Sequence, residues 1–379
     1  MTFDHSFVFG MRVNRNVVCY SIIIVCIIWC TCIMYFLNPL NIGNPSHTEE
    51  YQEDEAEYVY EFLFGLRKTP ATTKVGLEVG LRKRGLRTMR SKYTPGHKLN
   101  ASHICKDQGA NLSLLIVVTS APYHFGDRLD IRRTWGQLGK QMNVAIAFFV
   151  GQTNSFYTSR KILEEEYTYG DIIQGNFIDI YNHLSLKTLS ILEWANRYCS
   201  RVKFLLKTDD DMFINVPLLL NLIAKDLDIH RSIMGSLSNN LTPVRDTSSK
   251  YYLSLGDFPL AEFPQFVCGP AYLMTSDVIS ELYNHALNSA FFKLEDVLFT
   301  GIFARSLKID LVNIKGFVKQ DVGFDNCQVK QAYAIHDVKH NEKFLYWKLF
   351  LEENCVEKEQ HNLNLDMTHF INITLWRTA

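Results

Sequence analysis

The sequence has no excess of charge of either sign. Its 39 Lys and Arg residues nearly balance its 40 Asp and Glu residues, which leaves a formal net charge of −1 over 379 residues. Nucleic-acid-binding proteins need concentrated positive charge, so this balance gives no indication of that class. The chain also lacks an internal repeat of the length that builds solenoids.

Cysteine spacings typical of metal sites are missing as well. None of the nine cysteines forms a Cys-x-x-Cys pair or a Cys/His cluster, so no zinc site is indicated. Four of them lie in a hydrophobic run between residues 17 and 37. The other five are an odd number, so at least one thiol is free or pairs with another chain. They are Cys105, Cys199, Cys268, Cys327 and Cys355.

Charged residues are absent from Val17–Leu37, which is long enough to cross the hydrocarbon core of a membrane. Bulky residues and Pro39 occupy the place where a signal peptide would have its cleavage site, so we expect an uncleaved signal-anchor. Arg12 and Arg15 precede this transmembrane segment and a run of acidic residues follows it. The positive-inside rule therefore predicts a single-pass type II membrane protein with residues 1–16 in the cytosol.

Residues 38–104 have the composition of a lumenal stem. From Arg67 to Lys98 the chain is basic, with Glu78 as its only acid, and shows little regular apolar periodicity. We expect a solvated linker that holds the catalytic domain, residues 105–379, away from the membrane. Contact of this basic stretch with lipid head groups or an anionic acceptor is the alternative.

Four Asn-x-Ser/Thr tripeptides lie on the expected lumenal side of the anchor, and none precedes it. Each is a candidate N-glycosylation site, although one of them, Asn111, adjoins an expected buried strand. The four asparagines are Asn100, Asn111, Asn240 and Asn372.

From Cys105 onward, apolar runs alternate with helix-like stretches. This alternation predicts a doubly wound α/β sheet, with helices on both faces. Runs of Val, Ile, Leu and Phe are typical of strands that are covered on both faces. Strands are expected at residues 112–119, 144–150, 171–173, 202–208, 266–274 and 309–314. Helices are expected at residues 155–167, 184–199, 276–286 and 296–307.

Three consecutive carboxylates, Asp209, Asp210 and Asp211, follow the apolar run 202–206. Because side chains alternate along an extended segment, we expect Asp209 and Asp211 on one face and Asp210 on the other. Open α/β sheets bind ligands at strand ends, and packed carboxylates repel one another unless a cation neutralises them. The cluster therefore predicts a Mn²⁺ or Mg²⁺ site for a diphosphate. A solvated turn that caps the helix beginning at Pro217 is the alternative.

Short blocks of residues occur in a distinctive order after the stem. They are Arg128–Trp135, Phe149–Gly151, Tyr169–Gln174, Phe177–Tyr181, Leu184–Thr188, Lys207–Asn215, Phe263–Tyr272, Glu295–Val297 with Gly301, and Cys327 with His336. In this order and spacing they resemble the β1,3-galactosyltransferase family of Golgi enzymes, across essentially the whole lumenal domain. The resemblance implies a glycosyltransferase A type of fold with a Rossmann-like mixed sheet and helices on both faces. It also implies a UDP-sugar donor and a Golgi membrane location with a lumenal catalytic domain.

The resemblance also implies a metal site for the diphosphate leaving group. Asp211 and the imidazole of His336 would suit Mn²⁺, with Asp209 or a water molecule assisting. For Asp209 the alternative is contact with the ribose or base, and for His336 it is a packed histidine.

An inverting transfer needs a base that removes the proton from the acceptor hydroxyl. Asp296 is the expected base and Glu295 the alternate. Capping of the following helix is the structural alternative for Asp296.

The remaining candidates concern the nucleotide sugar. Arg128 and Arg132 are four apart on an expected helix, so they share a face, and a solvated helix edge is the alternative. Gly269 would lie beside the donor sugar or form a tight turn. The full set is Arg128, Arg132, Asp179, Lys187, Asp209, Asp210, Gly269 and Tyr272.

We therefore expect a metal-dependent, inverting enzyme that transfers galactose from UDP-galactose in β1,3 linkage to a glycan of a glycoprotein or glycolipid. A β1,3-N-acetylglucosaminyltransferase that uses UDP-N-acetylglucosamine is the first alternative. A non-catalytic Golgi binding or chaperone protein with the same fold is the second.

The charge asymmetry around the anchor generates a prediction about topology. Peptide N-glycosidase treatment of the protein expressed in animal cells should lower its apparent mass, with Asn240 or Asn372 among the modified sites. A protein without glycan whose C-terminus is accessible to protease from the cytosol would contradict the orientation.

Overall fold

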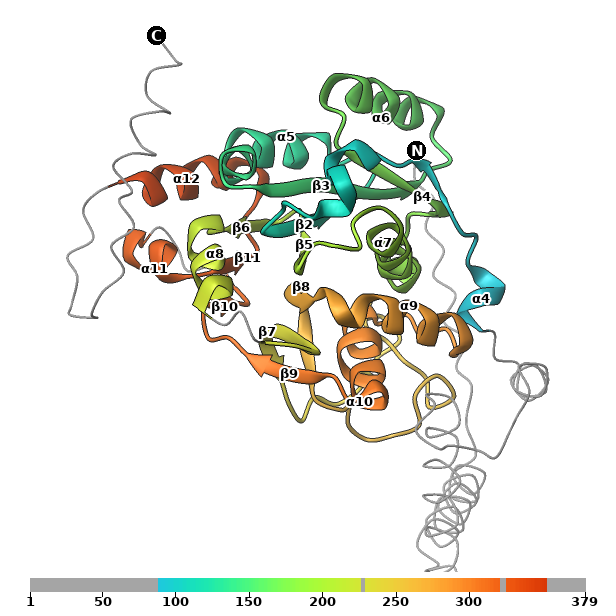
Figure 1. The fold of residues 1–379 in the computed structure, drawn as a ribbon. Helices are drawn as coiled ribbons and strands as arrows, with labels where there is room; N and C mark the ends of the chain where they lie inside the picture. The colour runs from blue at the N-terminus through green and yellow to red at the C-terminus, as the bar shows by residue number, and fades with distance from the viewer. Residues whose placement is uncertain (1–87, 226–228, 321–324, 353–379) are drawn as a thin grey trace, which may run out of the picture. The chain divides into compact units, whose positions relative to one another are not determined.

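An eight-stranded sheet forms the centre of the folded region (Figure 1). The computed structural model describes residues 88–225, 229–320 and 325–352. The strand order is β1-β4-β3-β2-β5-β8-β7-β9. These strands are β1 (His97–Leu99), β2 (Leu114–Thr119), β3 (Val144–Gln152), β4 (Ile172–Ile178), β5 (Phe204–Asp209), β7 (Ser232–Ser238), β8 (Phe266–Thr275) and β9 (Asp310–Asn313).

Several expectations concern residues outside the described ranges. They include the cytosolic tail, the anchor Val17–Leu37, the stem up to residue 87, Asn372 and Cys355. Among the described residues, no helix has the length and apolar character needed to cross a membrane.

The sheet is mixed, and its parallel part is the most deeply covered. Strands β4, β3, β2 and β5 run parallel, while β8 is antiparallel to both β5 and β7. All six residues of β2 are buried, which explains why its sequence, LLIVVT, is apolar up to its last residue. The expected mixed α/β class is confirmed.

Helices cover both faces of the sheet. Leu115 and Val117 belong to a buried cluster with α7 and α9, whereas Ile116 and Val118 belong to a second cluster with α5, α8 and α12. Figure 1 accordingly shows α8, α11 and α12 on one side of the strands and α7 and α9 on the other. The α-helices are α4 (Met89–Lys92), α5 (Phe125–Arg133), α6 (Phe156–Tyr169), α7 (Leu184–Tyr198), α8 (Val216–Lys225), α9 (Ile279–Asn288), α10 (Ala304–Leu307), α11 (Asn326–Gln331) and α12 (Lys343–Leu351).

A three-stranded sheet lies beside the end of β5. Its order is β10 (Phe317–Val318), β11 (Ala334–His336) and β6 (Met212–Ile214). Strand β6 begins immediately after Asp211 and pairs antiparallel with β11, in a register that sets His336 opposite Met212. This pairing brings two distant parts of the chain to the same point.

The folded region begins before the expected boundary at Cys105. Residues 88–104, assigned to the stem from composition, contain α4 and β1, and β1 pairs with β4. A disulfide between Cys105 and Cys199 then ties the segment to the end of α7. The sequence did not indicate this packing, because the segment has a basic composition and β1 has only three residues. Cys327 is also disulfide-bonded, and Cys268 is the free thiol among the described residues.

Two secondary-structure expectations need correction. The strand expected at 171–173 continues to Ile178, and β1 and β3 pair with it on either side. The sequence did not reveal its full length because polar Gln174 and Asn176 obscured the apolar pattern. The helix expected at 296–307 begins as a π-helix, η5 (Val297–Phe303), before α10. Strand β7 was not expected at all.

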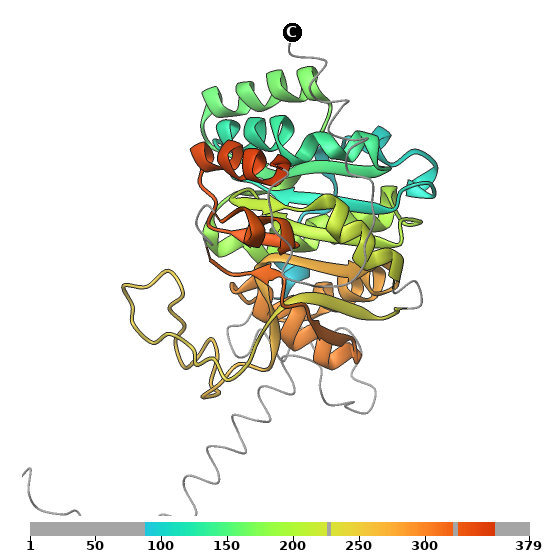
Figure 2. The same cartoon turned by 90° about the vertical axis from the view of Figure 1, so that its left-hand side faces the viewer.

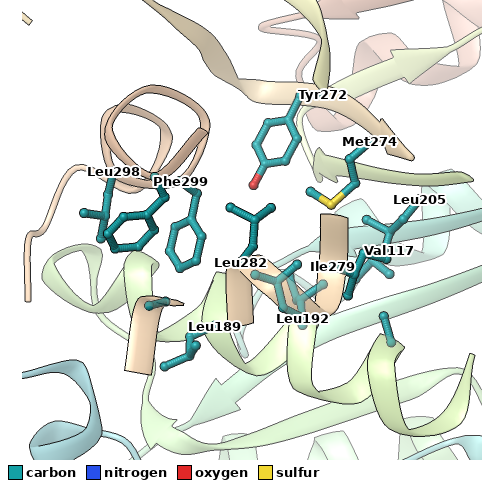
Figure 3. Packing of buried hydrophobic residues seen from close by; sticks show 14 of the residues in the cluster. Val117, Leu189, Leu192, Leu205, Tyr272, Met274, Ile279, Leu282, Leu298 and Phe299 are labelled. Atoms are coloured by element: carbon teal, nitrogen blue, oxygen red, sulfur yellow. The ribbon is translucent and has the colours of Figure 1, made fainter. Parts of the chain in front are cut away.

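The π-helix packs directly on β8. A Cβ atom at Gly301 would lie 3.0 Å from the Cβ of Phe266, so the two elements approach closely there. Thr300 Oγ1 accepts a hydrogen bond from the Val267 amide at 2.9 Å. Figure 3 shows Tyr272 extending from β8 toward Leu282 of α9 and Phe299 of η5. The residues just before η5 are therefore held close to β8.

Candidate active site

A cavity of about 570 Å³ lies at the carboxyl ends of β2 and β5. Thr119 ends β2 and pairs in register with Asp209, which ends β5. Both residues line the cavity, together with Asp211, His336, Glu295 and Asp296. The sheet thus places carboxylates from two separate sequence blocks at one ligand-sized hollow, in the position where α/β sheets bind ligands.

The three consecutive aspartates have different neighbours. Asp209 and Asp211 line the cavity, whereas Asp210 accepts a hydrogen bond from Ser120 Oγ at 2.6 Å and lies 2.9 Å from His124 Nδ1. This is the alternation expected of an extended segment. Asp210 therefore supports the loop after β2 rather than facing the cavity.

Asp211 and His336 form the pair best suited to a divalent metal. His336 Nε2 lies 3.4 Å from Asp211 Oδ2, and His336 Nδ1 lies 2.9 Å from the carbonyl oxygen of Lys319. A histidine that donates one ring N–H to a carbonyl leaves its other nitrogen available as a ligand. Asp211 Oδ1 is buried and has no hydrogen-bond partner among the described residues. These features fit a Mn²⁺ site.

The two side chains stabilise each other's charged forms. Burial opposes the charged form of Asp211, but the hydrogen bond to His336 lowers the pKa of this carboxyl below its usual range. The Asp211 carboxylate in turn raises the pKa of His336 to about 9. Within residues 88–225, 229–320 and 325–352, no group of three or more His, Cys, Asp or Glu side chains is arranged around one point. A metal held here would thus have two protein ligands and take its others from substrate and water.

Asp209 is engaged differently from Asp211. Its Oδ1 atom accepts hydrogen bonds from Thr119 Oγ1 and from Lys207 Nζ, the latter at 2.7 Å. The carboxylate is therefore already paired with a cation of the protein. This arrangement favours ribose or base contact for Asp209 over metal ligation.

Asp296 lies where the backbone fixes both of its carboxylate oxygens. Its Oδ1 accepts the Val297 amide at 2.9 Å and its Oδ2 accepts the Gly269 amide at 3.1 Å. A Cβ atom at Gly269 would lie 3.2 Å from Asp296 Oδ2, so the close approach depends on this glycine. Burial raises the pKa of Asp296, and the two amides oppose that rise. The residue also caps η5, as the structural alternative proposed.

Glu295 is held more tightly by side chains. The Tyr272 hydroxyl donates to Glu295 Oε1 at 2.5 Å, and Lys207 Nζ lies 3.8 Å from Oε2. Burial raises the pKa of Glu295, and the charge of Lys207 opposes the shift. Tyr272 is fully buried, so it positions this carboxylate and does not itself line the cavity.

Two buried lysines tie these groups together. Lys207 donates to the carbonyl oxygen of Gly269 at 2.7 Å as well as to Asp209. Burial opposes its charged form, but Asp209 and then Glu295 raise the pKa of Lys207 above its usual value. Lys187 forms a buried salt bridge with Asp179 at 2.8 Å. Of these residues, Asp179 lies outside the cavity lining.

The structure corrects the expected placement of Arg128 and Arg132. They share a helix face, but Arg128 is fully buried and both guanidinium groups contact Glu165 at 2.7 Å. Arg132 also pairs with Asp171 at 2.6 Å. Neither arginine lines the cavity. The four-residue spacing predicted that both arginines lie on one helix face. It could not show that Glu165 of α6 contacts that face.

The other expected sites are at the surface. Asn100, Asn111 and Asn240 are all exposed, including Asn111, which lies three residues before the start of β2. Asn240 adopts a φ of 53°, a left-handed conformation that asparagine tolerates.

Several cavity residues were missed by the sequence analysis. They are Thr119, Tyr181, Thr188, Lys207, Lys250 and Tyr251. Lys207 opens the block Lys207–Asn215 and could have been found as a charge inside an apolar strand. No sequence pattern indicated Tyr251, because the segment between β7 and β8 has neither a strand nor a helix pattern.

The buried arginine generates a prediction about stability. Arg128→Ala should lower the free energy of unfolding by about 3–5 kcal/mol, because it breaks a buried ion pair. Arg133→Ala, on the exposed face of the same helix, should change it by less than about 0.5 kcal/mol. Chemical denaturation would measure both. An Arg128→Ala protein with unchanged stability and lost UDP binding would instead assign this arginine to the nucleotide.

Comparison with known proteins supplies the family. A family model described as Galactosyltransferase matches residues 127–315. Human beta-1,3-galactosyltransferase 5 is 35% identical over 242 residues, which cover 62% of this chain and 77% of the relative. Mouse beta-1,3-galactosyltransferase 1 is 29% identical, with 62% of this chain and 72% of the relative covered.

A relative named for a different donor sugar also matches. Human lactosylceramide 1,3-N-acetyl-beta-D-glucosaminyltransferase is 33% identical, over 65% of this chain and 66% of the relative. Among solved structures, the galactosyltransferase LgtC with donor and acceptor sugar analogues has 11% identity and a TM-score of 0.32, over 64% of this chain and 98% of that one. That likeness is too low to support an argument about the fold. On the sequence matches, the chain belongs to the galactosyltransferase family and is a glycosyltransferase enzyme.

Proposed function

We propose that this enzyme transfers galactose from UDP-galactose to a glycan of a glycoprotein or glycolipid, in β1,3 linkage and with inversion at the anomeric carbon. The observation that carries the proposal is the meeting, in one cavity, of the Asp211–His336 pair with the Glu295–Asp296 pair. The first pair suits a metal-bound diphosphate and the second suits proton removal. The relatives named as β1,3-galactosyltransferases support the donor and the linkage.

Asp211 and His336 would hold Mn²⁺ at one end of the cavity. The metal would supply charge stabilisation for the diphosphate as the sugar departs. Lys319, exposed at the same end of the cavity, would add a second positive charge for the phosphates. Asp209 would bind the ribose or base, since its carboxylate is already fixed by Thr119 and Lys207.

Asp296 would act as the base. The acceptor oxygen forms a bond to the anomeric carbon while the bond from that carbon to the phosphate oxygen breaks, and the acceptor proton passes to the carboxylate. Each Asp296 oxygen accepts one backbone amide, so lone pairs remain to receive that proton. The buried environment that raises the pKa of Asp296 also makes it a stronger base.

The proposal includes a type of fold and a cellular location. We infer a glycosyltransferase A type of domain, anchored by Val17–Leu37 as a type II protein of the Golgi membrane. The parallel strands with a ligand cavity at their carboxyl ends support the first inference. The uncharged segment and its flanking charges support the second.

A donor panel tests the function directly. The lumenal region, produced as a secreted protein, should release UDP from UDP-galactose faster than from other UDP-sugars when Mn²⁺ and β-linked oligosaccharide acceptors are present. Chelation should abolish transfer. Preference for UDP-N-acetylglucosamine would support the alternative donor, which one relative at 33% identity favours.

The metal ligands can be tested without turnover. Asp211→Asn should reduce Mn²⁺ binding in the presence of UDP, measured by calorimetry, while Asp310→Asn on exposed β9 should leave it unchanged. Equal Mn²⁺ affinity in the Asp211 variant and the wild type would remove Asp211 as a ligand.

We expect substitutions of the two adjacent acids, Asp296 and Glu295, to lower the transfer rate by different amounts. Asp296→Asn should keep UDP binding nearly intact while transfer falls by about 10²-fold or more, because proton removal occurs only in the transition state. Glu295→Gln should reduce transfer less. Steady-state kinetics with calorimetric UDP binding would measure both variants. The reverse order of damage would assign the base to Glu295, and an unchanged rate in both variants would exclude this pair as the base.

A further inference from the structure

Two tyrosines from separate segments meet at the cavity. Tyr181 belongs to the short helix η3 (Tyr181–His183), and Tyr251 to the long segment that joins β7 to β8. Their ring centroids lie 6.1 Å apart in an edge-to-face arrangement, and both rings line the cavity. Tyr181 is 37% exposed and Tyr251 46% exposed. Large aromatic side chains this exposed, in a ligand cavity, are available for contact with a substrate.

A lysine completes this aromatic group. The Lys250 ammonium lies 5.4 Å from the centroid of the Tyr181 ring and 4.9 Å from that of Tyr251. Within the described residues, Lys250 has no salt bridge, unlike Lys187 and Lys207 deeper in the same cavity. Its ammonium therefore orients the rings by cation–π attraction and keeps donors for a ligand.

The segment that carries Tyr251 is fixed at its base. Arg245 donates four hydrogen bonds to backbone carbonyl oxygens, and Leu253 and Phe258 are buried in the core. The four acceptors are Leu253, Ser254, Phe258 and Leu260, at distances from 2.8 to 3.2 Å. Figure 2 shows this segment as the yellow loop that extends from the strands. Tyr251 and Lys250 are thus held in place before any ligand arrives.

The position of Tyr181, Tyr251 and Lys250 relative to the reacting residues indicates which ligand they contact. The base Asp296 lines the same cavity, and its charge is among the causes, after burial and Tyr251, that raise the pKa of the Tyr181 hydroxyl. That hydroxyl stays protonated as a hydrogen-bond donor. The diphosphate end of the donor is assigned to Asp211 and His336. An acceptor must reach Asp296 from solvent, and the two tyrosines are exposed members of the lining, as are the apolar residues Leu241 and Val244.

We propose that Tyr181 and Tyr251 form the acceptor subsite, where the apolar face of an uncharged pyranose packs on the aromatic pair and its hydroxyls bond to Lys250 and the tyrosine hydroxyls. Arg245 is a positioning residue that acts through Tyr251. This inference rests on the proposed function, and it adds the residues that recognise the acceptor. A sugar ring suits the site because one of its faces is apolar while its edges carry hydroxyl groups.

The test separates acceptor recognition from donor chemistry. In the secreted lumenal protein, Tyr251→Ala and Tyr181→Ala should each raise the acceptor KM about five- to tenfold, the range expected for loss of one aromatic contact. The KM for UDP-galactose and the slow hydrolysis of UDP-galactose without acceptor should stay unchanged. Tyr251→Phe should keep most of the acceptor affinity. Tyr167→Ala, which truncates a 94% exposed tyrosine on α6, is the matched control and should change nothing.

Substitutions of Arg245 provide an independent test of the acceptor subsite. Arg245→Ala should raise the acceptor KM with little change in kcat, and Arg245→Lys should restore it in part, because a lysine can reach fewer carbonyls. Arg160→Ala, at an exposed arginine on α6, is its control. An unchanged acceptor KM in both tyrosine-to-alanine variants, or an equal rise in the donor KM, would overturn the subsite. A wild-type protein that transfers no sugar would instead contradict the proposed function itself.

Discussion

The geometry of the cavity depends on one buried cation. Lys207 lies inside the sheet, where water cannot stabilise its charge, so protein groups must do so. Asp209 and the Gly269 carbonyl each lie 2.7 Å from its ammonium, and Glu295 lies 3.8 Å from it. These contacts join the end of β5 to β8 and to the turn before η5. The two acidic blocks of the cavity are therefore held by the same side chain.

Among the described residues, the buried cations beneath the cavity have carboxylate partners, whereas Lys250 at its entrance has no salt bridge. Below it, Lys187 pairs with Asp179, and Arg128 pairs with Glu165 at fully or nearly buried positions. Buried ions need such partners, and these ion pairs support the segments around the cavity. At the entrance, the Lys250 ammonium lies over the rings of Tyr181 and Tyr251. This contrast distinguishes residues that build the site from residues available to a substrate.

The fold was predictable where the local pattern was strong. The strands β2 and β3 are long, mostly apolar runs and β5 begins with one, a pattern that follows from burial on both faces. Strands β7 and β6 were not predicted, because β7 contains small polar residues and β6 has three residues. Arg128 and Arg132 show the same limit in the site, since their spacing indicated a shared face but not the Glu165 that meets it.

The sequence alone determined the chemical groups and the face that each presents locally. The three aspartates alternate because an extended backbone requires it, and the order of the blocks identifies the family. Only the tertiary structure decided which blocks meet. His336 reaches Asp211 through the pairing of β11 with β6, and Tyr251 reaches Tyr181 through the segment that Arg245 holds. Local rules act between residues close in the chain, whereas these contacts arise from long-range strand pairing and packing, which no short pattern encodes.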